Sequence, residues 1–94
     1  MRQVELKITG VVQGVFFRAE TRAKAVSLGL RGWVMNNTDG SVSVLAQGDE
    51  GVLRDFVEWC RNGPDGAEVD NVEEKWGEID DDGEKAELFT ISAS

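Results

Sequence analysis

Apolar and polar residues alternate along the first stretch of the chain, where Val4, Leu6 and Ile8 are separated by polar side chains. A period of two residues is typical of a half-buried strand, so we predict a strand over residues 3–9. The same kind of pattern, bounded by turn residues, predicts four further strands. Their ranges are 31–36, 41–47, 67–79 and 85–92.

Three details of this pattern refine the predicted strands. Val69 and Val72 do not keep strict alternation, so we expect the strand over 67–79 to be bent or bulged. In the last strand, Phe89 and Ile91 are two residues apart and should both face the core. Residues 37–40 read Asn-Thr-Asp-Gly, and Asp-Gly predicts a turn that joins the second and third strands into a hairpin.

Two segments between the strands have helical spacing instead. In the first, which runs from Arg18 to a stop at Gly29, one face is predicted to carry Ala19, Ala23, Val26 and Leu30. In the second, the apolar face is predicted to carry Leu53, Phe56, Val57 and Cys60. Asp49 is a suitable N-cap for this second helix, and Gly63-Pro64 ends it.

The predicted order is strand, helix, strand, strand, helix, strand and a last strand. Two helices of this length can cover one face of a sheet. We therefore predict an α+β fold, a ferredoxin-like βαββαβ sandwich whose sheet is mainly antiparallel, with an extra C-terminal strand. With 94 residues and no linker or low-complexity segment, residues 1–94 are expected to form a single domain.

The loop from Gly10 to Arg18 connects the first strand to the first helix and has features of an anion site. Gly14 can adopt a positive φ, which lets successive backbone N–H groups converge. The helix that follows adds its positive N-terminal end. Arg18 adds a planar charged fork that suits a phosphate. We therefore predict that this loop holds a phosphoryl group.

Charge and composition narrow the function further. The net charge of −8 argues against nucleic acid as a partner. Residues 1–48 carry six basic and three acidic side chains, and residues 49–94 carry four basic and fifteen acidic ones. Either this asymmetry steers a small anion to the loop, or the second half simply has solvated acidic faces. The apolar runs are too short to cross a membrane, and the N-terminus already resembles a strand rather than a signal peptide. We expect a cytoplasmic monomer.

The sequence has no histidine and a single cysteine. The commonest general base and metal ligand is therefore missing, and no internal disulfide is possible. Chemistry would have to use arginine, asparagine, carboxylates and the backbone. Cys60, on the apolar face of its helix, is predicted to be a core thiol. The acidic run Asp80-Asp81-Asp82 is interpreted as a solvated turn rather than a cation site.

Two motifs in the right order resemble the acylphosphatase family. The first is Gly10-x-Val12-Gln13-Gly14-Val15-x-Phe17-Arg18, which is similar to the phosphate loop of that family. The second is Gly32-Trp33-Val34-Met35-Asn36, followed by Gly40, Val42 and Gly48 at the expected intervals. Gly63-Pro64-x-Gly66-Ala67-x-Val69 and Phe89-x-Ile91 also match. The resemblance extends over essentially the whole chain.

This resemblance implies hydrolysis of the carboxyl–phosphate anhydride of a small acyl phosphate, without a cofactor or metal. It implies that Arg18 and the loop N–H groups bind the phosphate and that Asn36 positions the attacking water. The implied catalytic residues are Arg18 and Asn36, and the implied substrate-binding residues are Val12, Gln13, Gly14, Val15, Phe16, Phe17 and Arg18. Asn37 is a rival to Asn36, but the spacing to Gly40 and Gly48 selects Asn36 and leaves Asn37 to the turn.

Other features of the sequence allow more than one interpretation. Ala19 and Met35 depart from the residues common at these positions in the family, and either could alter substrate preference or rate. One of Phe16 and Phe17 should pack inward, and Trp33 should pack within the sheet or core. A non-catalytic anion- or metabolite-binding module on the same fold is the main alternative. A ferredoxin-like RNA-binding domain is a distant third, opposed by the acidic charge.

Overall fold

In the computed structural model, the described residues are 1–13, 16–79 and 88–92. The element order matches the predicted one. The elements are β1 (Arg2–Val11), α1 (Phe17–Ser27), β2 (Arg31–Asn36), β3 (Val42–Gly48), α2 (Glu50–Asn62), β4 (Glu68–Glu78) and β5 (Phe89–Ile91). The predicted acidic turn and the first part of the predicted last strand lie outside the described residues.

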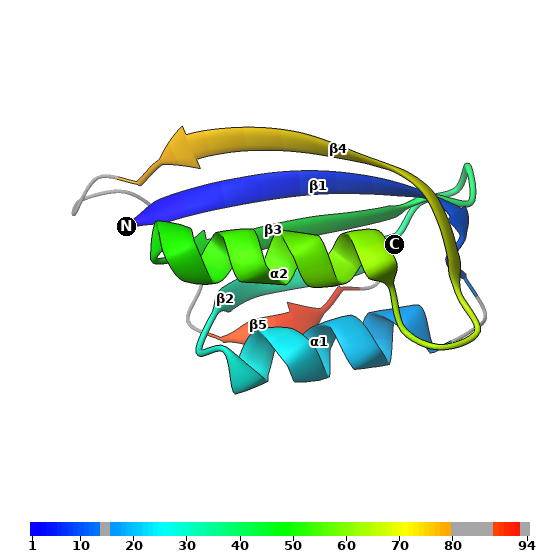
Figure 1. Cartoon of the computed structure of the whole chain (residues 1–94), viewed down its shortest axis with the longest axis horizontal. Helices are drawn as coiled ribbons and strands as arrows, with labels where there is room; N and C mark the ends of the chain where they lie inside the picture. The colour runs from blue at the N-terminus through cyan, green and yellow to red at the C-terminus, as the bar shows by residue number, and fades with distance from the viewer. Residues whose placement is uncertain (14–15, 80–87, 93–94) are drawn as a thin grey trace.

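The strands form one five-stranded sheet in the order β4-β1-β3-β2-β5. Only β5 pairs with its neighbour, β2, in parallel, and the other described pairings are antiparallel. Both helices lie on the same face of this sheet, α2 across β1 and β3 and α1 across β2 and β5 (Figure 1). The predicted ferredoxin-like fold with an additional C-terminal strand is therefore confirmed.

The core lies between the sheet and the helices. Val4, Leu6 and Ile8 alternate into it from β1, each at most 3% exposed. The predicted apolar face of α2 is confirmed, since its four residues, Leu53, Phe56, Val57 and Cys60, are all buried. Phe89 is also buried, and its ring meets that of Phe56 edge-to-face with centroids 6.1 Å apart. This contact joins β5 to α2 across the core.

The predicted buried face of α1 is wrong. The buried residues of this helix are Phe17, Thr21 and Ala25, whereas Ala19, Ala23 and Val26 are exposed. Alanines bury too little area to decide which side of a helix turns inward, and the large ring of Phe17 decides it instead. Leu30, the last residue of the predicted face, is buried but lies beyond the helix.

The predicted irregularity of β4 is confirmed as a bulge opposite the end of β1. Thr9 pairs with Asn71 and Gly10 pairs with Val69, which leaves one extra residue on β4. Gly10 has a φ of 130°, and a Cβ there would lie 2.1 Å from the carbonyl oxygen of Glu68. The first glycine of the loop motif is therefore required by the close approach of β4.

Ile91 was predicted to face the core, but it is 43% exposed. Its pairing with Val34 does give it the inward orientation that alternation predicts. The end of the sheet is not covered at that point, however, because α1 begins there and leaves an open cavity that Ile91 lines. The correct face of a strand is thus no guarantee of burial at its end.

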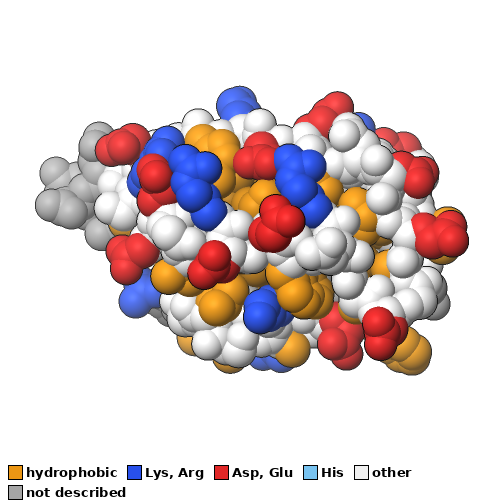
Figure 2. All heavy atoms as spheres, in the orientation of Figure 1, with side chains coloured by type: hydrophobic (Ala, Val, Ile, Leu, Met, Phe, Trp, Pro, Cys, Tyr) orange, Lys and Arg blue, Asp and Glu red, His pale blue; other side chains and the backbone are white. Residues whose placement is uncertain are grey.

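Many of the charges over α2 are paired. Acidic and basic side chains lie beside one another on this face of the molecule (Figure 2). Glu50 bonds with Arg2 and with Arg54, and these bonds lower the pKa of its carboxyl group. Arg2 and Arg54 also lie over the ring of Trp76, at 5.3 and 5.1 Å from its centroid. Part of the acidity of the second half is therefore balanced locally.

Among the described residues, no helix is long and apolar enough to cross a membrane.

Candidate active site

The site forms where β2 ends beside the start of α1. Side chains alternate along β2, so Val34 and Asn36 point to the helix-covered face and Met35 points to the opposite face. Trp33 lies on the same face as Met35, and its cross-strand neighbour on β3 is Leu45. This position agrees with the prediction that Trp33 packs within the sheet. Asn36 thus reaches the site because of its register. Met35 does not line the site cavity.

The start of α1 presents backbone N–H groups without side-chain caps. Its N-cap residue, Phe16, has φ 59° and ψ 22°, and no side chain of the described residues caps the helix by a hydrogen bond. A left-handed residue followed by helical ones turns successive N–H groups toward one point, which makes a concave anion site. Phe17 is 1% exposed and Phe16 is 82% exposed. The prediction that one of the two packs inward is confirmed for Phe17.

Gln13 connects the loop to the β2–β3 hairpin. Its Nε2 donates hydrogen bonds of 2.9 Å to the carbonyl oxygens of both Asn37 and Ser41. Asn37 in turn donates from its side chain to the hydroxyls of Ser41 and Ser43 at 2.8 Å, which agrees with the turn role predicted for it. These contacts fix the hairpin end, and therefore Asn36, relative to the loop. The side chain of Gln13 was not expected to have this role, because local sequence patterns do not reveal contacts between distant segments.

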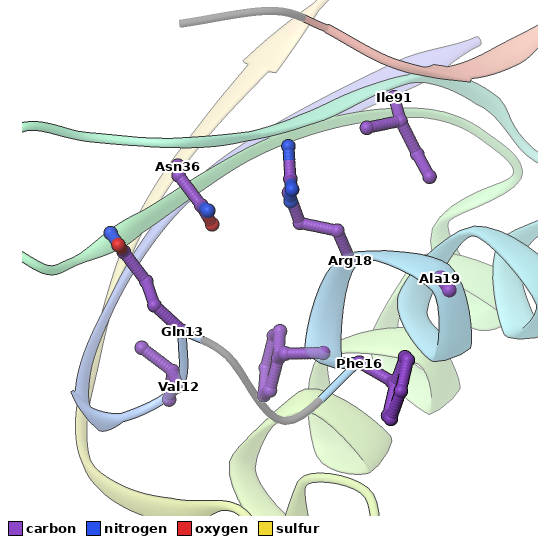
Figure 3. Close-up of a pocket in the computed structure, with 8 residues that line it drawn as sticks. Val12, Gln13, Phe16, Arg18, Ala19, Asn36 and Ile91 are labelled. Atoms are coloured by element: carbon purple, nitrogen blue, oxygen red, sulfur yellow. The ribbon is translucent and has the colours of Figure 1, made fainter.

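A cavity of about 310 Å³ lies between these elements. Figure 3 shows the guanidinium of Arg18 reaching from α1 into the space between Asn36 on β2 and Ile91 on β5. The described residues that line it are Val12, Gln13, Phe16, Phe17, Arg18, Ala19, Asn36 and Ile91. Five of the seven residues predicted to bind substrate are among them, and the other two, Gly14 and Val15, lie outside the described residues. Ala19 and Ile91 were not predicted to be site residues.

Gln13, Arg18 and Asn36 are the polar residues among the described lining of this cavity, and the last two have unused bonding capacity. Asn36 Oδ1 is buried and accepts no hydrogen bond from the described part of the chain. No ion pair links Arg18 to a described carboxylate. Arg18 is also the one charged residue among the described lining residues. A positive cavity with an orphaned acceptor suits an anion accompanied by a hydrogen-bond donor such as water.

Other groups that could carry chemistry lie elsewhere. Cys60 is fully buried in the core, and burial raises the pKa of its thiol, so the prediction of a core thiol is confirmed. Within residues 1–13, 16–79 and 88–92, no three His, Cys, Asp or Glu side chains cluster as metal ligands would. The acidic residues at positions 80–82 lie outside these ranges.

Comparison with known proteins places the sequence and the fold in a family. The family model described as acylphosphatase matches residues 4–91. An acylphosphatase of Pelotomaculum thermopropionicum is 48% identical over 69 residues, which cover 73% of this chain and 75% of that protein. The crystal structure of an acylphosphatase from Bacillus subtilis has a TM-score of 0.88 and 34% identity, covering 98% of this chain and 99% of the other. An acylphosphatase structure from Coxiella burnetii has a TM-score of 0.83 and 38% identity, covering 96% and 90%.

The chain therefore belongs to the acylphosphatase family, as its two motifs predicted. It is an enzyme of that class, whose reaction is the hydrolysis of acyl phosphates.

Proposed function

We propose that the phosphoryl group of an acyl phosphate binds at the N-terminus of α1, against the guanidinium of Arg18. The support is a helix start that no described side chain caps, with its left-handed Phe16, together with a guanidinium that has no described carboxylate partner. The helix end and Arg18 are both positive, and their positions are set before substrate arrives. They stabilise the charge on the transferring phosphoryl oxygens without rearrangement.

In this proposal Asn36 holds the attacking water. Its buried Oδ1 has no described partner, and a carboxamide oxygen accepts a hydrogen bond from water. An amide is too weak a base to remove a proton, so its contribution is orientation of the water in line with the bond that breaks. The orphaned Oδ1 in the same cavity as Arg18 is the observation that carries the catalytic assignment.

The reaction suits this set of groups. The water oxygen bonds to phosphorus while the bond from phosphorus to the acyl oxygen breaks. The electron pair of the broken bond leaves with the carboxylate. A carboxylate has a conjugate-acid pKa of about 4, so it departs without a general acid. The proton lost by the water ends on inorganic phosphate or in solvent. Catalysis then consists of positioning and charge stabilisation, as for other phosphoryl transfers through loose transition states.

The alternative is a non-catalytic module that binds an anion on the same fold. Such a module needs Arg18 and the helix N-terminus, but it does not need a buried acceptor beside them. An unsatisfied buried acceptor costs about 1–3 kcal/mol. In a module that only binds an anion, Asn36 Oδ1 would lower the stability of the fold without contributing to function. This cost favours hydrolysis over binding alone.

The test is hydrolysis of benzoyl phosphate in the presence of EDTA. We expect turnover without added metal and competitive inhibition by inorganic phosphate. If the protein bound phosphate with micromolar to millimolar affinity and never turned over the substrate, the binding module would be the correct function.

A further inference from the structure

Ile91 is an apolar residue that lies outside the buried core cluster of the described residues. It is 43% exposed on the edge strand β5 and contributes to the wall of the site cavity. Two hydrogen bonds to backbone carbonyl oxygens help to hold β5 beside the cavity. Arg22 Nε donates to the carbonyl oxygen of Phe89 at 3.1 Å, and Ser92 N donates to that of Val34 at 2.9 Å. These bonds hold the backbone on either side of Ile91, whose side chain lines the cavity.

The arrangement around Arg18 has two chemically different sides. Figure 3 shows Asn36 on one side of the guanidinium, and Ile91 and Ala19 on the other. Asn36 is polar with an unused acceptor. Ala19 is exposed in the first turn of α1, and it lines the same cavity as Ile91. One side of the cavity thus suits water, and the opposite side suits an apolar group.

In-line displacement assigns a role to each side. The attacking and leaving oxygens lie on opposite sides of phosphorus. If phosphate lies against Arg18 and water lies at Asn36, the departing carboxylate must point away from Asn36. That direction leads to Ala19 and Ile91. This step rests on the proposed function of Arg18 and Asn36.

We propose that the acyl group of the substrate lies over Ala19 and Ile91. This apolar side of the cavity gives the enzyme a preference for apolar acyl groups over acetyl. An aromatic or branched acyl group would cover the exposed face of Ile91 and remove apolar surface from water. An acetyl group is too short to do so. The small side chain of Ala19 leaves room for the larger group beside the first turn of α1.

The test compares benzoyl phosphate with acetyl phosphate on the wild type, Ile91→Thr and Leu88→Thr. Thr keeps the β-branched shape but is less apolar. Leu88 is the matched control, because it is 72% exposed just before β5 and does not line the cavity. Comparing the ratio of the two kcat/KM values between proteins cancels the different intrinsic reactivity of the two substrates. The Ki of inorganic phosphate reports the phosphate site separately.

For Ile91→Thr we expect kcat/KM for benzoyl phosphate to fall about fivefold, a loss in the range of one small apolar contact. Acetyl phosphate turnover and the phosphate Ki should stay within about twofold of wild type. Leu88→Thr should change none of these, and Ile91→Phe should raise the benzoyl-to-acetyl ratio. An unchanged ratio in both Ile91 variants, or an equal loss for both substrates, would overturn the proposal. If wild type hydrolysed neither substrate, the proposed function itself would fail.

Discussion

Gln13 Nε2 donates a 2.9 Å hydrogen bond to the carbonyl oxygen of Asn37, the residue that directly follows Asn36. The bond connects two segments that are 24 residues apart in the sequence. One segment begins the loop that leads to Arg18, and the other ends the strand that carries Asn36. The relative position of the two proposed catalytic side chains therefore depends on this contact and on the matching bond to Ser41.

Gln13→Met tests this positioning role. Met has nearly the same length as Gln but donates no hydrogen bond. We expect kcat to fall about tenfold, because water at Asn36 is no longer held in line with the substrate. The Ki of inorganic phosphate should change by less than about twofold, because Arg18 and the helix N-terminus remain.

The control for that variant is Gln3→Met, near the start of β1, the strand that leads to the loop with Gln13. An equal loss of kcat in Gln3→Met would mean that general loosening of the fold is responsible. So would a parallel rise in the phosphate Ki of Gln13→Met.

Arg18→Gln should abolish both binding and turnover. The positive charge and the planar fork are lost together, and we expect the Ki of phosphate to rise by at least about 100-fold. Arg18→Lys keeps the charge without the fork, so it should recover part of the phosphate affinity and less of kcat. Lys24→Gln, on the last turn of α1, removes one positive charge from the same helix and should leave both constants near wild type. Equal losses in Arg18→Gln and Lys24→Gln would point to long-range electrostatics rather than contact.

Cys60 should be inert and dispensable for the reaction. It is 0% exposed, and burial raises the pKa of its thiol, so the reactive thiolate is not formed near neutral pH. We expect iodoacetamide to leave the native protein unmodified and to alkylate it in urea. Cys60→Ala should keep kcat while it lowers the free energy of unfolding by about 1–2 kcal/mol. Rapid alkylation of the native protein, accompanied by loss of activity, would contradict this assignment.

Asp39 should make a pH-dependent contribution to stability through the hairpin. Its carboxylate accepts hydrogen bonds from the backbone N–H and hydroxyl of Ser41 and lies 3.3 Å from Lys7 Nζ. The hydroxyl bond foremost, then the backbone bond, lowers the pKa of Asp39 from 3.8 to about 2. A lowered pKa means that the ionised form stabilises the fold above the unfolded pKa and that this contribution disappears as pH falls through the folded one.

Urea unfolding of wild type and Asp39→Asn between pH 2 and 7 would detect this contribution. The difference in midpoint should be constant above about pH 4.5 and should shrink between about pH 4 and 2. A difference that stayed constant over the whole range would show that the charge of Asp39 is not involved.

The sequence predicted the parts of this molecule that depend on local pattern. The alternation of Val4, Leu6 and Ile8 was enough to orient β1, and the large apolar residues of α2 were enough to orient that helix. The predicted buried face of α1 was wrong because its small alanines do not determine which side is buried. A polar residue such as Thr21 would also not be expected in the core. It is nonetheless fully buried, and its hydroxyl has no hydrogen-bond partner among the described residues.

The candidate site was predictable only in part for a related reason. The two motifs identified Arg18 and Asn36, and strand alternation would bring Asn36 to the helix-covered face. Motif spacing does not report contacts between distant segments, so the side-chain role of Gln13 was not visible. Alternation assigned Ile91 to the correct face but could not reveal that the helix leaves that end of the sheet open.

The assignment of Asn36 rather than its neighbour can be checked with Asn37→Ala. The side chain of Asn37 is occupied by bonds to Ser41 and Ser43, so its loss should lower the unfolding midpoint and leave most of kcat. Loss of turnover in Asn37→Ala, without loss of stability, would transfer the proposed role to Asn37.

The central claim is that Arg18 binds the phosphate while Asn36 makes the site catalytic. The most direct measurement is kcat for benzoyl phosphate together with the Ki of inorganic phosphate in Asn36→Ala. We predict that kcat falls by about 100-fold or more, because the water loses its positioning group, while Ki stays within about threefold of wild type. A variant that binds phosphate normally and retains full kcat would contradict the claim.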